Sequence, residues 1–176
     1  MIIDHVRDSA RELPEVDDPS SVTAMRIWHC KFRSLESLRA YVNLRVLVVA
    51  SYPDSSLEPI RGLADLRYLR LIHLPVVEDL SPLVGLARLE TLRLATLPSW
   101  DSSGKTTRVE SLKPLASLSA LRHLELFGIV PDDGSLAPLE RCASLRTVRL
   151  SKYPPREVDR FYADTGLDAS YAPSRP

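Results

Sequence analysis

Apolar residues recur along most of the chain in the frame L-x-x-L-x-L, followed about half a repeat later by L-x-P-L-x-x-L. The frame begins at residues 22, 44, 66, 89, 121 and 145, so its six copies are separated by steps of 22, 22, 23, 32 and 24 residues. The L-x-L part alternates with a period of two, which predicts a short strand with one buried face. The three-residue spacing of the second part predicts a short helical or 3₁₀ turn.

Proline takes the same place in four of the second halves, at Pro59, Pro82, Pro114 and Pro138. Because proline lacks a backbone N–H, it fits the first turn of a helix, where that donor would have no partner. A bundle of long helices would also accommodate the leucine spacing, but each proline inside a helix costs about 3 kcal/mol. The pattern therefore favours stacked short turns, which together bury a column of leucines that one turn cannot bury alone.

In these two motifs the chain resembles the leucine-rich repeat family, in its short internalin-like form of about 22 residues per repeat. The resemblance covers residues 22–153. It implies an α/β solenoid of about six repeats: a right-handed coil with parallel strands on its concave side and short helical or 3₁₀ turns on its convex side. The family usually has Asn or Cys three residues after the last strand leucine. The corresponding residues here are Cys30, Tyr52, Leu74, Leu97, Ile129 and Tyr153. The turn after each strand therefore needs other partners for its backbone groups.

We predict four segments: an N-terminal cap (1–21), the solenoid (22–153), a C-terminal capping helix (154–167) and a disordered tail (168–176). Caps are expected because a solenoid exposes apolar core at both ends. The first segment is acidic, and the sequence leaves open whether it caps the core or covers the concave face. In the helix, Val158, Phe161 and Tyr162 share one face, and Gly166 fits the C-terminal stop.

Composition narrows the class of protein. The chain has 176 residues, 44% of them hydrophobic, with 23 basic and 23 acidic side chains, as expected for one soluble globular domain. It has no apolar run of about 18 residues to span a membrane, no secretory signal, and only two cysteines, too few for a disulfide framework. We therefore expect a cytoplasmic protein. Its preference for arginine over lysine suggests a bacterial source with a GC-rich genome.

Residues that often carry chemistry do not assemble into a catalytic or metal site. His29, His73 and His123 fall on alternate turns, roughly 10 Å apart, which is too far for one metal ion. Cys30 and Cys142 occupy apolar frame positions and are expected to be buried thiols. We therefore expect no metal, no cofactor and no enzymatic activity.

The step of 32 residues contains an insertion, 100–108, in which Gly104-Lys105-Thr106 matches the end of a P-loop. The first glycine of that motif would fall on Ser99, and no helix is predicted after Thr106. We therefore expect no nucleotide there. The insertion is either a flexible excursion or a loop that contacts a partner.

The outward strand positions form columns across the concave face. The central column contains Arg70 and Arg93 on neighbouring strands, about 5 Å apart, and aromatic side chains flank it. Tyr, Trp and Arg most often anchor protein interfaces, although arginine is also the main solubilising cation of this chain. The predicted partner-binding residues are Arg26, Trp28, Tyr68, Arg70, Ile72, Arg93, Trp100, His123, Glu125, Phe127 and Arg149.

We therefore expect a non-enzymatic module that binds a partner protein on its concave face, such as a small bacterial adaptor or an immunity-type protein. The alternative is binding of an anion or a nucleic acid through the arginine column. Residues 22–176 carry 21 basic and 17 acidic side chains, so their formal charge is only +4, and nucleic acid is the less favoured partner. If Arg70 and Arg93 are both exposed, replacing both with glutamate should abolish binding and leave stability unchanged.

Overall fold

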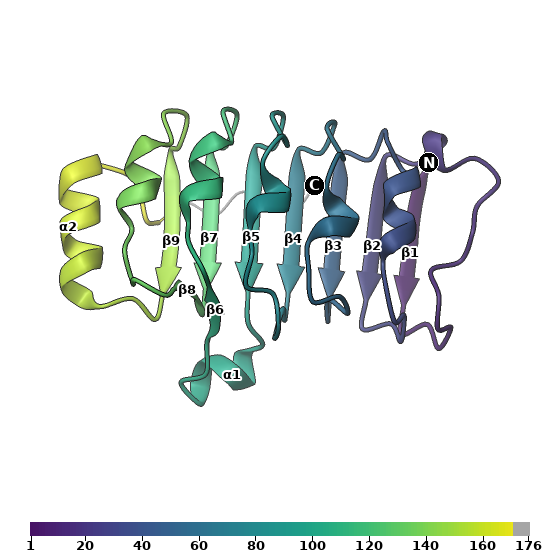
Figure 1. The fold of residues 1–176 in the computed structure, drawn as a ribbon, viewed down its shortest axis with the longest axis horizontal. Coiled ribbons are helices and arrows are strands. Elements are labelled where there is room, and N and C mark those ends of the chain that lie inside the picture. The colour runs from purple at the N-terminus through teal and green to yellow at the C-terminus, as the bar shows by residue number, and fades with distance from the viewer. Residues whose placement is uncertain (171–176) are drawn as a thin grey trace.

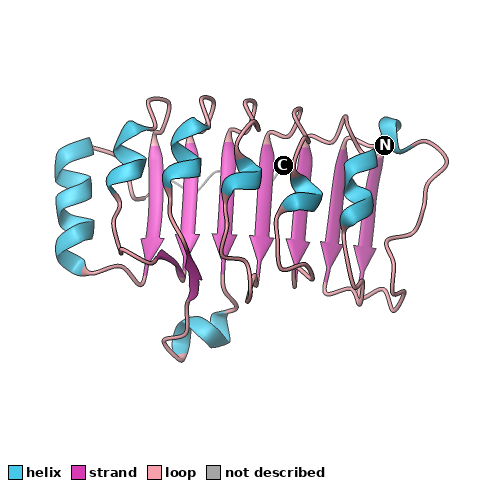
Figure 2. Cartoon of the chain, viewed as in Figure 1, coloured by secondary structure: helices cyan, strands magenta, loops and turns pink. Residues whose placement is uncertain are grey.

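The computed structural model describes residues 1–170 of the chain, which form an elongated solenoid (Figure 1). Seven parallel strands make one sheet in the order β1-β2-β3-β4-β5-β7-β9. Their bounds are β1 Ile2–Val6, β2 Ala24–Trp28, β3 Val46–Ala50, β4 Tyr68–Ile72, β5 Thr91–Ala95, β7 His123–Phe127 and β9 Thr147–Ser151. Short 3₁₀ turns cover one face of this sheet (Figure 2). They are η1 Pro19–Ser21, η2 Glu36–Ala40, η3 Glu58–Ile60, η4 Ser81–Leu83, η5 Lys113–Ser117 and η6 Ala137–Arg141. The predicted α/β solenoid is thus confirmed.

The leucine frame forms the core because neighbouring strands pair in one constant register. Leu47 pairs with Leu69, Leu69 with Leu92, and Leu92 with Leu124. These side chains are between 0% and 2% exposed, and they belong to one apolar cluster that runs along the coil. Each turn thus buries its leucines against the next turn, as the stacking argument requires.

The sequence pattern did not predict the first strand, because the leucine frame begins only at residue 22. β1 pairs with β2 in the same register as the later strands, with Ile2 opposite Ala24 and Val6 opposite Trp28. The leucine frame fails there because His5 occupies the inward position that Ile27 takes in β2. The His5 ring instead packs edge-to-face on Phe32, with the ring centres 5.5 Å apart. The acidic first segment therefore contributes a further strand to the sheet.

Each 3₁₀ turn on the convex side begins at a polar side chain that accepts a backbone hydrogen bond two residues further on. Ser56 Oγ accepts from the N–H of Glu58 at 3.1 Å, and Asp79 Oδ1 accepts from the N–H of Ser81 at 2.7 Å. Ser111 and Ser135 do the same before the later turns. These local bonds compete with strand pairing and favour a turn, so the coil reverses direction at each of them.

Side chains of other types replace the missing asparagine ladder at the ends of the strands. Tyr153 Oη donates to the carbonyl of Ile129 at 2.8 Å, and Thr107 Oγ1 donates to the carbonyl of Leu74 at 3.0 Å. The residue that directly follows most strands of the large sheet has a left-handed backbone conformation, with φ between 52° and 70°. After β7 this residue is Gly128. A Cβ at Gly128 would lie 2.5 Å from Thr96 Oγ1, so close packing also requires glycine there.

The insertion is anchored to the coil, in contrast to the flexible excursion considered above. It contains α1 (Pro98–Ser102) and β6 (Thr107–Val109), and β6 pairs in parallel with β8 (Ile129–Pro131) to form a second, two-stranded sheet. Trp100 packs edge-to-face on His73 at 5.1 Å, and Lys105 Nζ lies 5.8 Å from the centre of the Trp100 ring. Because a strand follows Thr106, the P-loop-like residues do not open a helix.

The last helix, α2 (Pro155–Thr165), lies against the far end of the coil (Figure 1). Phe161 is fully buried, and Gly166 ends the helix with a φ of 65°. After the helix, Asp168 forms an isolated parallel bridge with Thr147. Most of the tail predicted to be disordered, residues 171–176, lies outside the described part of the chain.

Acid should weaken the docking of α2. Hydrogen bonds from Arg160 and from the backbone N–H of Leu136 lower the pKa of Glu157 below its ordinary value of 4.5. The folded state thus holds this carboxylate ionised more strongly than the unfolded chain does. Its contribution to stability is complete above pH 4.5 and is lost as the pH falls through the lower folded-state pKa. We expect the melting temperature to fall on acidification, and to fall less steeply for Glu157→Gln.

Calorimetry from neutral to acidic pH measures this dependence. Glu12→Gln, at an exposed loop position, is the control and should follow the wild type. Parallel curves for Glu157→Gln and wild type would contradict the role assigned to Glu157.

Candidate functional site

The sheet face that turns away from the 3₁₀ turns, here called the concave face, carries the predicted columns in register. The central column runs from Asp4 on β1 through Arg26, Val48, Arg70, Arg93 and Glu125 to Arg149 on β9. The neighbouring column runs from Val6 through Trp28, Ala50, Ile72, Ala95 and Phe127 to Ser151. The structure therefore brings together most of the residues singled out in the sequence.

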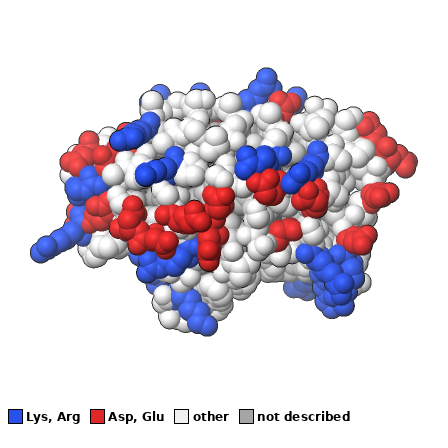
Figure 3. Space-filling model, viewed as in Figure 1, with Lys and Arg blue, Asp and Glu red and all other residues white. Residues whose placement is uncertain are grey.

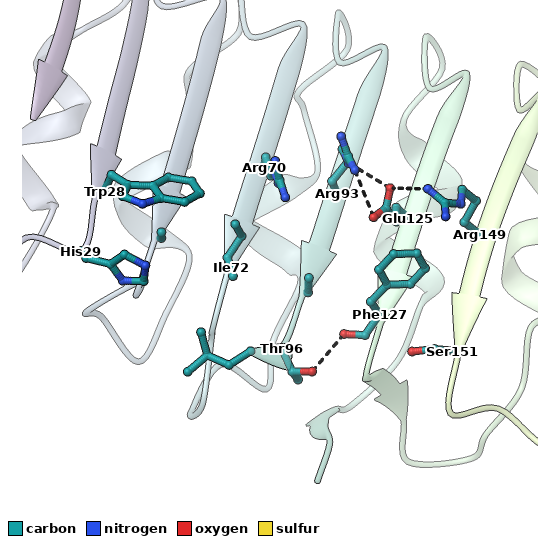
Figure 4. Close-up of a pocket in the computed structure, with 13 residues that line it drawn as sticks. Trp28, His29, Arg70, Ile72, Arg93, Thr96, Glu125, Phe127, Arg149 and Ser151 are labelled. Carbon is teal, nitrogen blue, oxygen red and sulfur yellow. Dashed lines mark hydrogen bonds and ion pairs between the residues drawn. The ribbon is translucent and has the colours of Figure 1, made fainter. Parts of the chain in front are cut away.

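The central column contains ion pairs that the sequence analysis did not anticipate. Arg93 Nε lies 2.9 Å from Glu125 Oε2, and Arg149 Nη1 lies 3.6 Å from the same oxygen (Figure 4). Glu125 and Arg93 are 8% and 14% exposed in their side chains. The expectation that Arg93 is exposed, and can be replaced at no cost to stability, is therefore wrong. Glutamate at residue 93 would face Glu125 in a partly buried site.

Tyr68 was also predicted to be an exposed anchor, but it is only 6% exposed. Its hydroxyl accepts a hydrogen bond from Arg93 Nη1 at 3.4 Å. Burial disfavours the charged form of Arg93, yet the hydrogen bonds with Glu125 and Tyr68 outweigh this effect and raise its pKa. Tyr68 and Glu125 therefore hold the Arg93 guanidinium in place.

Three further predicted residues, His123, Trp100 and Arg26, make contacts of their own. His123 Nδ1 is 2.8 Å from Thr147 Oγ1, and burial lowers the pKa of its imidazole, so it is neutral near pH 7. Trp100 lies in α1, where it contacts His73 and Lys105. At the first strand, Arg26 Nε donates to Asp4 Oδ1 at 2.7 Å, so these two charges are already paired.

A groove of about 680 Å³ lies on the concave face, between the rings of Trp28 and Phe127 (Figure 4). Ala50 and Ala95 leave space on its floor on either side of Ile72. Arg70, Arg93, Glu125 and Arg149 also line this groove. The alternation of large and small residues in the Trp28 column is a sequence signal for this shape that we did not use.

A second hollow of about 470 Å³ continues the concave face toward the N-terminus, and the sequence analysis missed it as well. Its lining is mainly apolar and includes Ile2, Ala24, Val46 and Val48. Ile2 is 79% exposed on β1, the strand that the leucine frame did not reveal. This hollow is thus mainly apolar, although Asp4, Arg26 and Arg70 also belong to its lining.

The described residues offer few reactive or metal-binding groups outside the concave face. Burial raises the pKa of the Cys142 thiol to about 11, so it is an unreactive, protonated group near neutral pH. Within residues 1–170, no three His, Cys, Asp or Glu side chains gather where they could hold a metal ion. None of the helices in that range is long and apolar enough to cross a membrane.

Comparison with known proteins finds similar folds among solved structures. No protein-family model and no curated protein sequence matches the chain. Among solved structures it is similar to internalin C2 from Listeria monocytogenes, with 25% sequence identity, a TM-score of 0.56 and 75% of this chain covered. An internalin (inlF) from the same organism matches with 18% identity and a TM-score of 0.44, over 76% of this chain and 43% of its own.

The chain has the leucine-rich repeat fold. Its short repeats are of the internalin-like kind that the sequence pattern indicated. It spans 53% of the internalin C2 chain, so it corresponds to about half of that structure.

Proposed function

We propose that this protein is a non-enzymatic interaction module that binds a partner protein in the groove between Trp28 and Phe127. The observation that carries the proposal is the groove itself, which combines aromatic walls, a floor of small residues and arginine side chains. Aromatic and arginine side chains around a partly desolvated hollow are the usual anchors of protein interfaces. The similarity to internalin C2 supports a binding role for the repeat fold.

The convex face, over the 3₁₀ turns, differs from the concave face in the distribution of its charges. Acidic and basic side chains are interspersed over the 3₁₀ turns (Figure 3). Many of them pair with each other, as Arg61 does with Glu58 and Arg160 with Glu140. Such a mixed, solvated surface keeps a protein soluble and gives little affinity by itself. The concave face, with half-buried Trp28, Ile72 and Phe127, is therefore the better candidate for binding.

The alternative of a nucleic-acid binder has less support. Arg26 is paired with Asp4, and Arg93 and Arg149 both contact Glu125, so these three column arginines already face a carboxylate within the protein. A nucleic-acid site needs several cations that contact successive phosphates. We therefore retain a protein as the partner.

Ile72→Asp tests the groove. A carboxylate at the centre of the floor should oppose burial by an apolar partner surface, and we expect at least a tenfold loss of partner retention. The measurement compares immobilised wild type and variant as baits in extracts of the native cell, with quantitative mass spectrometry of the retained proteins. Melting curves establish that both baits are folded.

Val84→Asp is the matched control, because Val84 is 46% exposed and follows η4 on the opposite side of the coil. It introduces the same charge and should retain the partner. Equal retention by wild type, Ile72→Asp and Val84→Asp would contradict binding in the groove.

A further inference from the structure

We propose that the outer edge of β1 binds an extended segment of a partner protein, which adds a further strand to the large sheet. The segment would place apolar side chains opposite Ile2 and Val6, and an uncharged polar side chain opposite Asp4. This site lies at the β1 end of the sheet, and β1 contributes no residue to the groove between Trp28 and Phe127.

The backbone of β1 has hydrogen-bonding groups on both sides, and β2 takes only one side. In a parallel ladder, alternate residues of a strand direct their N–H and C=O groups to opposite sides. The N–H of Arg7 donates to the carbonyl of Trp28 at 2.8 Å, so the odd-numbered residues of β1 face β2. Ile2, Asp4 and Val6 therefore direct their backbone groups outward. Within residues 1–170, β1 is the last strand on that side of the sheet.

The opposite edge of the sheet, at β9, is closed by the chain itself. The N–H of Val148 donates to the carbonyl of Asp168 at 3.1 Å, and the carbonyl of Val148 accepts from Tyr162 Oη at 2.5 Å. Open edge strands recruit other chains unless a covering segment, a bulge or a proline prevents pairing. β1 contains no proline, and its register with β2 is continuous. The fold therefore protects one edge and leaves the other able to pair.

The same strand also exposes apolar side chains. Ile2 is 79% exposed and Val6 is 51% exposed, on either side of Asp4. Ile2 lines the hollow of about 470 Å³, together with other apolar residues and with Asp4, Arg26 and Arg70. When a strand is added to a sheet edge, backbone hydrogen bonds give affinity and alternate side chains give specificity. Apolar residues opposite Ile2 and Val6 would bury these two side chains.

The charge at the centre of β1 argues against a second copy of this chain as the partner. Antiparallel pairing of two β1 strands, with Ile2 opposite Val6, would bring Asp4 opposite Asp4. Like charges at directly opposed positions are unfavourable. Arg26 Nε already donates to Asp4 Oδ1 at 2.7 Å, so the carboxylate is paired within the protein. A segment with serine or threonine at that position avoids the repulsion and needs no further cation.

The test uses peptides as the probe. Random peptides of about 12 residues, displayed on phage, are selected on the full-length protein, and the enriched sequences are synthesised with a fluorescein label. Their apolar residues should repeat the spacing of Ile2 and Val6. In anisotropy titrations, Val6→Pro should weaken binding at least tenfold, because it removes an outward N–H at an edge position where proline is tolerated.

Val6→Thr is the matched control. It keeps the N–H and the branched side chain, and it should bind the peptides as wild type does. Melting curves establish that both variants are folded. Equal binding by wild type and Val6→Pro would overturn the inference, as would a selection that enriches no peptides with the expected spacing.

Methylated peptides test the backbone hydrogen bonds without any change in the protein. A methyl group on a peptide nitrogen that pairs with β1 removes the donor and blocks close approach. The next nitrogen along an extended strand points away from β1. Methylation at successive residues should therefore lower affinity at every second position. Tolerance at all positions, or equal losses at all positions, would contradict strand addition.

Ile72→Asp separates this edge from the groove. It should leave the affinity of these peptides unchanged, because β2 and β3 lie between β1 and the strand of Ile72. Peptides that lose affinity with Ile72→Asp and keep it with Val6→Pro would refute the edge site and support binding in the groove. Sedimentation velocity tests the second copy: a wild-type dimer that dissociates in Val6→Pro would replace the partner segment with β1 of another copy.

Discussion

Leu92→Ala should lower the free energy of unfolding by about 2–5 kcal/mol. Leu92 is fully buried, and it lies between Leu69 on β4 and Leu124 on β7. Removing its side chain leaves a cavity in the central column of the core, which the neighbouring strands cannot close without disturbing their shared register. Urea denaturation followed by circular dichroism measures the change.

Leu92→Met is the matched control for this prediction. It nearly conserves side-chain volume and should cost less than about 1.5 kcal/mol. Equal stability of Leu92→Ala and wild type would show that the leucine does not support the coil.

Arg93→Glu should destabilise the protein by roughly 3 kcal/mol, because it removes the nearer of the two arginines that contact Glu125 and places a second carboxylate beside it. This value lies at the low end for breaking a buried ion pair, since the groove side of the pair is open to water. Arg141→Glu, at an exposed position of η6, should change stability by less than about 1 kcal/mol. Urea denaturation of the two single variants gives the comparison.

The reversed pair Arg93→Glu with Glu125→Arg provides the control. It restores opposite charges on β5 and β7 and should recover part of the lost stability. A reversed pair no more stable than Arg93→Glu alone would mean that the attraction between these residues does not cause the effect.

The leucine frame predicted the coil because each frame residue has one role, burial against the same residue of the next turn. It failed at the first strand, where His5 takes the inward position that Ile27 takes on β2, and packs on Phe32. It also did not reveal the second sheet, because β6 and β8 are each only three residues long. Strands this short carry too few alternations to be read from sequence.

The sequence predicted which residues point to the concave face, but it did not predict how deeply they are buried or which charges pair. Alternation along a strand gives the direction of a side chain but not its depth, and Tyr68 and Glu125 point to the concave face while being only 6% exposed. Arg93 contacts both of them, and Arg149 also contacts Glu125. The frame places Glu125 beside Arg93 on the neighbouring strand, but it does not give the depth at which the two charged groups meet. A list of arginines in one column does not contain that information.

The constant register has a consequence for what this surface can recognise. Trp28 and Phe127 stand on β2 and β7, with three strands between them. Gain or loss of one whole turn of chain between those strands would move the two rings apart or together by one strand spacing, about 4.8 Å, and leave every remaining pair of strands intact. The distance between the two rings can therefore change only in steps of one strand spacing. Insertion or deletion of whole repeats would alter the width of the groove while the leucine core keeps its packing.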